Sequence, residues 1–149
     1  MWKRFCELHF DLFNLTSDEY TYLLQSNLEQ IDVAVQRKEV IIKEISIEDK
    51  ERQDLIKQIN QTLPESEKII KVKDLLKFGL SIEGDLEQNH LTRYNLLLID
   101  LIEKIQAQNK RNQLFLNKAI ISLKEIRQDA MGNKNYNLYN GKGVLTQEK

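Results

Sequence analysis

The chain has 149 residues, enough for one domain, and is 41% hydrophobic and 30% charged. Its 22 basic and 23 acidic residues are spread along the sequence and leave a net charge of -1. Because no basic stripe forms, this distribution argues against nucleic-acid binding and against a role at a membrane surface. The single cysteine, Cys6, excludes an internal disulfide and fits a reducing cytosol. No apolar run is long enough to cross a membrane or to form a cleaved signal, so we expect a cytoplasmic protein.

Residues 2–15 can form an N-terminal helical segment, because five apolar residues at helical spacing share one face. These are Trp2, Phe5, Leu8, Leu12 and Leu15. The segment either packs on the rest of the protein or binds a partner. Thr16 and Glu19 have the spacing of a capping box, so a new helix can start at about residue 17. The helix can equally run through from near Trp2, and the sequence leaves both possibilities open.

Residues 17–63 carry a heptad seam, with steps that alternate between four and three residues over about six heptads. The seam comprises Leu24, Leu28, Ile31, Val35, Lys38, Ile42, Ile45, Asp49, Arg52, Ile56, Ile59 and Leu63. No Gly or Pro interrupts it before Pro64, which should end the helix. The pattern predicts a helix roughly 70 Å long that needs packing along one face to be stable.

A short helix is predicted over residues 67–78, with Ser66 as its cap and Gly79 at its end. A second long helix follows over residues 86–130. Its main apolar stripe comprises Leu91, Tyr94, Leu98, Leu101, Ile105, Phe115, Ala119, Leu123 and Ile126. This stripe is the natural cover for the first seam. The sequence therefore predicts an all-α fold, a long antiparallel coiled-coil-like hairpin with a short middle helix.

The second long helix carries a further apolar stripe at Ala107, Leu114 and Ile121, which recur every seven residues. On a helix these positions lie far around from Phe115, Ala119 and Ile126. A two-helix hairpin covers only one of the two faces. The other face is covered by the N-terminal segment, covered by a second copy in a homodimer, or open to a partner helix.

From residue 132 onward the helical pattern is lost, so we predict one helical domain over residues 1–131 and a flexible tail over residues 132–149. The tail nevertheless contains Tyr136, Leu138 and Tyr139. These residues make a short docking motif an alternative to a passive tail.

The sequence contains no enzymatic constellation, so we expect neither catalysis nor a cofactor. It has no Gly-rich phosphate loop, and its one cysteine and two histidines lack the partners of a nucleophilic triad. Cys6 and His9 supply only two ligands of a possible metal site, and no Glu-x-x-His pair faces a bundle core. We therefore predict no metal site.

Four stretches together resemble the FlgN family of flagellar type III export chaperones, and they cover most of residues 20–143. Tyr22-Leu23-Leu24 is similar to that family's aromatic-Leu-Leu opening. Two segments, Lys38 to Ile45 and Ile47 to Arg52, resemble the family's central stretch. Asn112-Gln113-Leu114-Phe115-Leu116-Asn117 resembles the last helix, and Tyr136-Asn137-Leu138-Tyr139-Asn140-Gly141-Lys142-Gly143 resembles the tail. The aromatic segment 2–13 departs from the family pattern.

The resemblance implies a cytosolic chaperone without cofactor or catalysis. Such a chaperone binds the C-terminal amphipathic helix of the hook–filament junction proteins, which are its export clients. It also docks at the export gate through the end of its last helix and its tail. Combined with the second apolar stripe and the tail residues, the resemblance assigns client binding to Ala107, Leu114 and Ile121. It assigns gate docking to Tyr136, Leu138 and Tyr139. The competing hypothesis is a structural coiled-coil protein whose second stripe mediates self-association.

Overall fold

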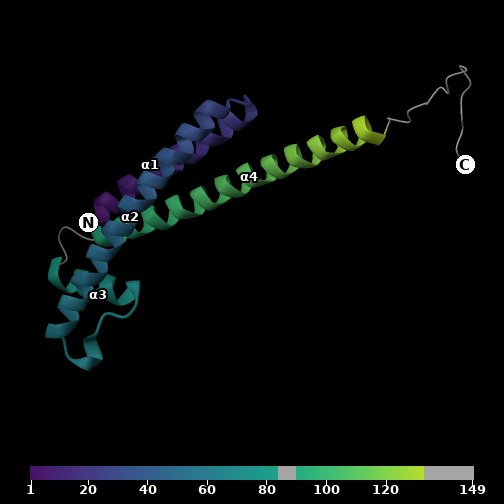
Figure 1. Cartoon of the computed structure of the whole chain (residues 1–149). Coiled ribbons are helices and arrows are strands. Elements are labelled where there is room, and N and C mark those ends of the chain that lie inside the picture. The colour runs from purple at the N-terminus through teal and green to yellow at the C-terminus, as the bar shows by residue number, and fades with distance from the viewer. Residues whose placement is uncertain (84–89, 133–149) are drawn as a thin grey trace, which may run out of the picture. The chain divides into compact units, whose positions relative to one another are not determined.

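The computed structural model describes residues 1–83 and 90–132. Its helices are α1 (Trp2–Leu24), α2 (Leu28–Thr62), α3 (Val72–Glu83) and α4 (His90–Gly132), with a 3-10 turn η1 (Glu65–Glu67) between α2 and α3 (Figure 1). The described residues contain no strand, so the all-α prediction is confirmed. The chain forms two compact units, residues 1–112 and 113–149, and α4 contributes to both. The predicted division at residue 131 stays a prediction.

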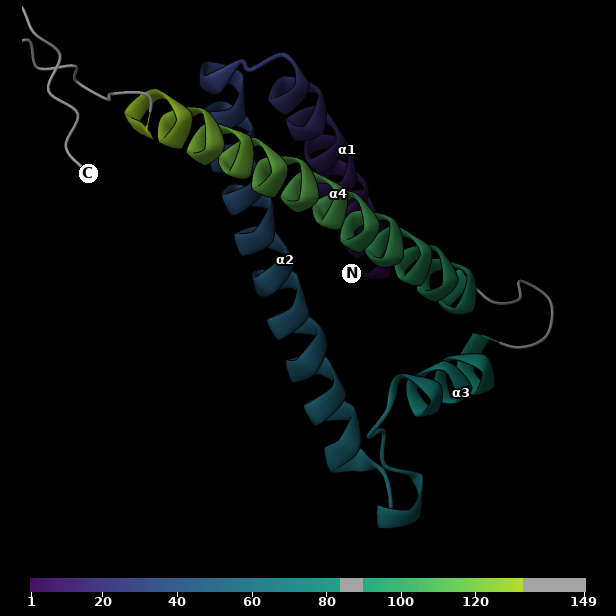
Figure 2. The same cartoon turned by 90° about the vertical axis from the view of Figure 1, so that its right-hand side faces the viewer.

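The predicted helix over residues 17–63 is wrong at its start, because the chain turns between Leu24 and Leu28. Ser26 adopts a positive φ of 53° in this turn, and the Asn27 side chain accepts a hydrogen bond from the backbone N–H of Gln30 at 3.2 Å. Asn27 thus caps α2, and α1 and α2 lie side by side as an antiparallel pair (Figure 2). The heptad steps continue through the turn, which is why periodicity alone did not reveal it.

Of the two alternatives at Thr16, the structure has the helix that runs through from Trp2 and not a new start capped by Thr16. Thr16 lies inside α1, fully buried, and its hydroxyl donates to the carbonyl oxygen of Leu12 at 2.7 Å. Because residues 2–15 continue directly into residues 17–24, α1 gains a long apolar face. That face is buried in the first unit, which offsets the cost of a mid-helix Thr.

The N-terminal segment packs on the rest of the first unit, as one of the two alternatives predicted. Phe5, Cys6 and Leu8 are buried. The Cys6 thiol donates to the carbonyl oxygen of Tyr94 in α4 at 3.3 Å, and Arg4 pairs with Glu44 of α2 at 2.8 Å. Residues 2–13 therefore lie between α2 and the first half of α4.

α2 ends at Thr62, so Pro64 stops the helix as predicted, but the short helix begins later than expected. Asn60 bonds both the N–H and the carbonyl of Ile69, at 2.8 and 2.9 Å, and the resulting loop delays α3 until Val72. The Asp74 carboxylate accepts from the N–H of Lys71 at 2.8 Å, so Asp74 and not Ser66 supports the start of α3. The predicted range of 67–78 for the short helix is therefore wrong.

Gly79 does not end α3, because the helix continues to Glu83. A Cβ atom at Gly79 would lie 2.8 Å from Cδ2 of Leu91, so glycine permits close packing against α4 here. The predicted start of the last helix at residue 86 lies outside the described residues, as does the tail after Gly132. α4 is described from His90 to Gly132, two residues beyond the predicted end.

The core of the first unit combines buried apolar side chains with one polar cluster. The buried apolar side chains are Phe5, Cys6, Leu8, Leu23, Ala34, Ile69, Leu75, Leu101 and Ile105. In the polar cluster, Lys38 pairs with Glu19 at 2.7 Å. Asn112 donates to the same carboxylate and to the carbonyl oxygen of Thr16, both at 3.0 Å. The cluster joins α1, α2 and α4. Lys38, a polar position of the predicted seam, is therefore half-buried where these three helices meet.

Candidate functional site

The second unit is described over residues 113–132, and seven of its large apolar side chains are exposed. They are Leu114, Leu116, Ile120, Ile121, Leu123, Ile126 and Met131. Scattered exposed apolar residues are ordinary, but these seven fall within five or six turns of one helix and project over most of its circumference. We call these seven residues the α4 apolar surface.

Leu114 and Ile121, two of the predicted site residues, are 53% and 55% exposed. They are seven residues apart and therefore share one side of the helix. Ala107, the third predicted residue, belongs to the first unit and is also exposed. No structural observation identifies what these residues bind, so their role stays a prediction.

The predicted main stripe is wrong in the second unit, because its members there are not buried. Leu123 and Ile126 are 66% and 64% exposed, Ala119 is exposed and Phe115 is half-buried. The prediction assumed an unbroken partner helix over residues 17–63. The turn at residues 25–27 assigns residues 17–24 to α1, so α2, with 35 residues, is shorter than that predicted helix. Leu123 and Ile126 join Leu114 and Ile121 among the exposed apolar residues.

Leu116, Ile120 and Met131 were missed by the sequence reasoning. They lie near Leu123 on an ideal helix, and a helical projection of residues 113–132 would have grouped them. They were overlooked because Leu123 was assigned to the core. The predicted docking residues Tyr136, Leu138 and Tyr139 lie outside the described residues.

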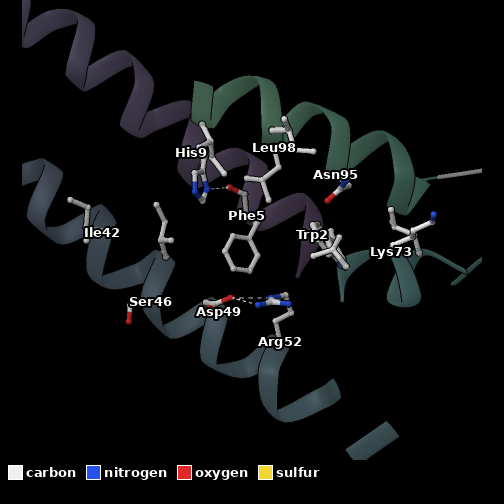
Figure 3. Close-up of a pocket in the computed structure, with 15 residues that line it drawn as sticks. Trp2, Phe5, His9, Ile42, Ser46, Asp49, Arg52, Lys73, Asn95 and Leu98 are labelled. Carbon is white, nitrogen blue, oxygen red and sulfur yellow. Dashed lines mark hydrogen bonds and ion pairs between the residues drawn. The ribbon is translucent and has the colours of Figure 1, made fainter. Parts of the chain in front are cut away.

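A mostly apolar cavity of about 800 Å³ lies in the first unit, among α1, α2, α3 and the first half of α4. Figure 3 shows Trp2 and Phe5 of α1 between Leu98 of α4 and the Asp49–Arg52 pair of α2. Arg52 donates to one carboxylate oxygen of Asp49 through Nε at 2.9 Å and Nη2 at 2.7 Å. Asp49 and Arg52, two polar positions of the predicted seam, therefore pair with each other at the wall of the cavity.

Within residues 1–83 and 90–132, no three His, Cys, Asp or Glu side chains are grouped as metal ligands. Nδ1 of His9 is 2.8 Å from the carbonyl oxygen of Phe5, and the Cys6 thiol donates to a backbone carbonyl. Burial raises the pKa of Cys6, and the charge of Glu7 raises it further. Cys6 is therefore held as the neutral thiol, the form that neither binds metal nor attacks a substrate.

Among the described residues, no helix is long and apolar enough to span a membrane. The α4 apolar surface lies along one helix. Such a face is suited to an amphipathic helix of another chain.

A family model described as FlgN protein matches residues 3–147. The chain belongs to the FlgN family. FlgN proteins are chaperones of flagellar assembly that bind export substrates, so this membership fits an open apolar helix face. The match also includes most of the aromatic segment 2–13, which the resemblance in individual motifs had left out. No curated protein and no solved structure matches the chain.

Proposed function

We propose that this FlgN protein is a cytoplasmic export chaperone without catalytic activity, whose clients are the flagellar hook–filament junction proteins. It binds the C-terminal amphipathic helix of the client and delivers the client to the type III export gate. The observation that supports this proposal best is the α4 apolar surface. A client helix that is unfolded before export must bury its own apolar stripe or assemble prematurely.

The energetics favour several anchors of moderate strength. Burying one Leu or Ile side chain contributes roughly 1.5–3 kcal/mol. Ordering an unfolded client segment costs about 2–5 kcal/mol. Two or three anchors are therefore needed before binding becomes favourable. Moderate net affinity suits a chaperone that must release its client at the gate.

We assign client binding to the stripe of Ala107, Leu114 and Ile121. The test is the binding of a purified junction-protein C-terminal segment to the full chain, measured by calorimetry. Leu114→Asp or Ile121→Asp should abolish binding while helicity is retained, because a carboxylate cannot be desolvated against an apolar helix. Gln113→Asp is the matched control, since it places the same charge at an exposed polar position about 100° around the same helix from Leu114.

Unchanged binding by both Leu114→Asp and Ile121→Asp would exclude this stripe. Loss of binding with Leu123→Asp alone would move the client to the other face of α4. If no junction-protein segment binds the wild-type chain, the proposed clients are wrong.

Gate docking is assigned to Tyr136, Leu138 and Tyr139. A chain that lacks residues 133–149 should bind the client normally and should associate less with the export gate component. Pull-down of that component by the client-loaded chaperone measures the difference. A truncated chaperone that exports its clients at the normal rate would exclude the tail as the docking element.

A further inference from the structure

α2 carries a second heptad pattern on a different side from the predicted seam. Val33, Val40 and Ile47 recur every seven residues, and Leu55 follows one residue beyond the next position. All four are exposed, Val40 and Ile47 by 54% and 61%. At 100° per residue they share one face of the helix, away from the half-buried Lys38 and Ile45 of the predicted seam. We call this set the outer face of α2.

Charged residues alternate with these apolar positions, also every seven residues. They are Arg37, Glu44 and Glu51. Glu44 pairs with Arg4 of α1 at 2.8 Å. Within the described part of the chain, neither Arg37 nor Glu51 has an ion pair or hydrogen bond. The outer face therefore carries one unpaired positive charge on one side of Glu44 and one unpaired negative charge on the other side.

A groove lies beside this face, between α1 and α2, with a volume of about 410 Å³. Leu15, Val40 and Ile41 are its apolar lining, and Asp11, Asn14 and Arg37 are its polar lining. A groove bordered by two helices can receive a side chain from a third helix, as a hole receives a knob in a coiled coil. Ile47, further along α2, has the exposure required of such a knob.

We propose that the outer face of α2 is a homodimer interface, on which α2 of a second copy packs in the antiparallel direction. With Glu44 at the two-fold axis, Arg37 lies opposite Glu51 of the second copy. Val33 then lies close to Leu55, and Ile47 of each copy lies close to Val40, at the groove of the other. A two-fold interface must be self-complementary, and this register makes it so in both charge and shape.

The alternation of charges selects a second copy as the occupant. Identical helices packed in parallel and in register would place Arg37 on Arg37 and Glu51 on Glu51, and like charges repel. Antiparallel packing converts the same charges into two attractive pairs related by the axis. The two Glu44 carboxylates that meet at the axis are each already paired with an arginine, which limits their repulsion. The interface uses no residue of the α4 apolar surface, so it is independent of the proposed client site.

The test is sedimentation velocity of the full chain over a concentration series in the micromolar range. The wild-type chain should dimerise. Arg37→Glu and Glu51→Arg should each weaken dimerisation by about tenfold or more, because each converts both interchain pairs into like charges. Mixing the two single variants should restore association. In the mixed dimer, the acidic side chain introduced at position 37 of one copy meets the basic side chain introduced at position 51 of the other, and the two unchanged residues also pair. The double variant should dimerise as well, with the polarity of both pairs reversed.

Lys110→Glu on α4 is the matched control, because it reverses an exposed positive charge off the outer face. It should leave dimerisation unchanged. Far-UV circular dichroism should be the same for all variants, since Arg37 and Glu51 have no ion pair or hydrogen bond to lose in the part of the chain that the structure describes. A wild-type chain that stays monomeric overturns the proposal, and so does a dimer that neither single variant weakens. Loss of client binding instead of dimerisation in Arg37→Glu would assign the face to the client and would equally overturn it.

Discussion

The Lys38 ammonium and the Glu19 carboxylate lie 2.7 Å apart in the core of the first unit, where their side chains are only 16% and 14% exposed. Lys38 also approaches the side-chain oxygen of Asn109 at 3.5 Å, and Glu19 accepts a second hydrogen bond from Asn112. The pair thus links α2 to both α1 and α4. Since every partner is polar and specifically placed, the cluster favours one register of the three helices over its alternatives.

Lys38→Met should lower the free energy of unfolding by about 2–4 kcal/mol, because it keeps the aliphatic stem but leaves a nearly buried carboxylate without its cation. Urea unfolding followed by circular dichroism measures this loss. Lys104→Met is the control. It removes a half-exposed pair with Asp100 and should cost at most about 0.5 kcal/mol. Equal losses in the two variants would mean that the Lys38 pair contributes no more than a surface pair.

Cys6 should react slowly with iodoacetamide in the folded chain and much faster in urea. Burial and Glu7 raise the pKa of its thiol above the ordinary 9.0, so little thiolate forms at mildly alkaline pH. Mass spectrometry of the labelled chain measures both rates. Rapid labelling of the folded chain would contradict the packing of α1 against Tyr94.

The same raised pKa predicts how stability depends on pH. The neutral thiol is favoured in the fold, so its contribution is fully present below about pH 9 and is lost as pH rises through the higher folded pKa. Cys6→Ser should remove this alkaline loss, since a hydroxyl does not titrate in that range. Urea unfolding at a series of pH values, compared between the two chains, measures the effect. If the free energies of unfolding of the two chains differ by the same amount at every pH in that window, Cys6 is not the group responsible.

Ser26→Gly should stabilise the chain by about 0.5–1 kcal/mol. Ser26 holds a φ of 53° in the turn between α1 and α2, a conformation that costs glycine almost nothing. Ser26→Val should instead destabilise by about 1–2 kcal/mol, because a β-branched side chain is disfavoured at positive φ. Thermal unfolding of both variants checks the order. The opposite order would show that the turn does not hold Ser26 in this conformation.

While Leu91 is present, Gly79→Ala should stabilise the chain by clearly less than the roughly 1 kcal/mol expected from helix propensity. The new methyl group would lie 2.8 Å from Cδ2 of Leu91, and the cost of moving this half-buried side chain offsets the gain. In a Leu91→Ala background the same substitution should stabilise by about 1 kcal/mol, because the space is then open. A double-mutant cycle by urea unfolding measures the coupling. Additive effects would rule out the close packing of α3 on α4.

Local signals predicted the helices well where one residue dominates the backbone. Pro64 ended α2 because proline cannot donate a backbone hydrogen bond inside a helix. The turn at Gln25–Asn27 contains no Gly or Pro, and its cap is a single Asn, so the heptad pattern masked it. Gly79 was read as a helix end, although its small size serves packing against Leu91.

The candidate site could be predicted only in part. Seven-residue spacing identified Leu114 and Ile121 as a surplus face, and both are exposed. The main stripe, with its three- and four-residue steps, assigned Leu123 and Ile126 to the face covered by the first seam, but both are exposed. Periodicity shows which side of a helix is apolar. It does not show which apolar side is covered, because coverage depends on the length and position of other helices.

The sequence by itself determined that this chain is helical and that its helices carry more apolar surface than one hairpin can bury. Both follow from residue spacing, which is a local property. Tertiary structure alone decided that α1 turns back at Ser26, that Lys38 and Glu19 are partners, and which apolar stripes stay open. Those outcomes depend on contacts between residues far apart in the chain, where burial and charge pairing outweigh local helix signals.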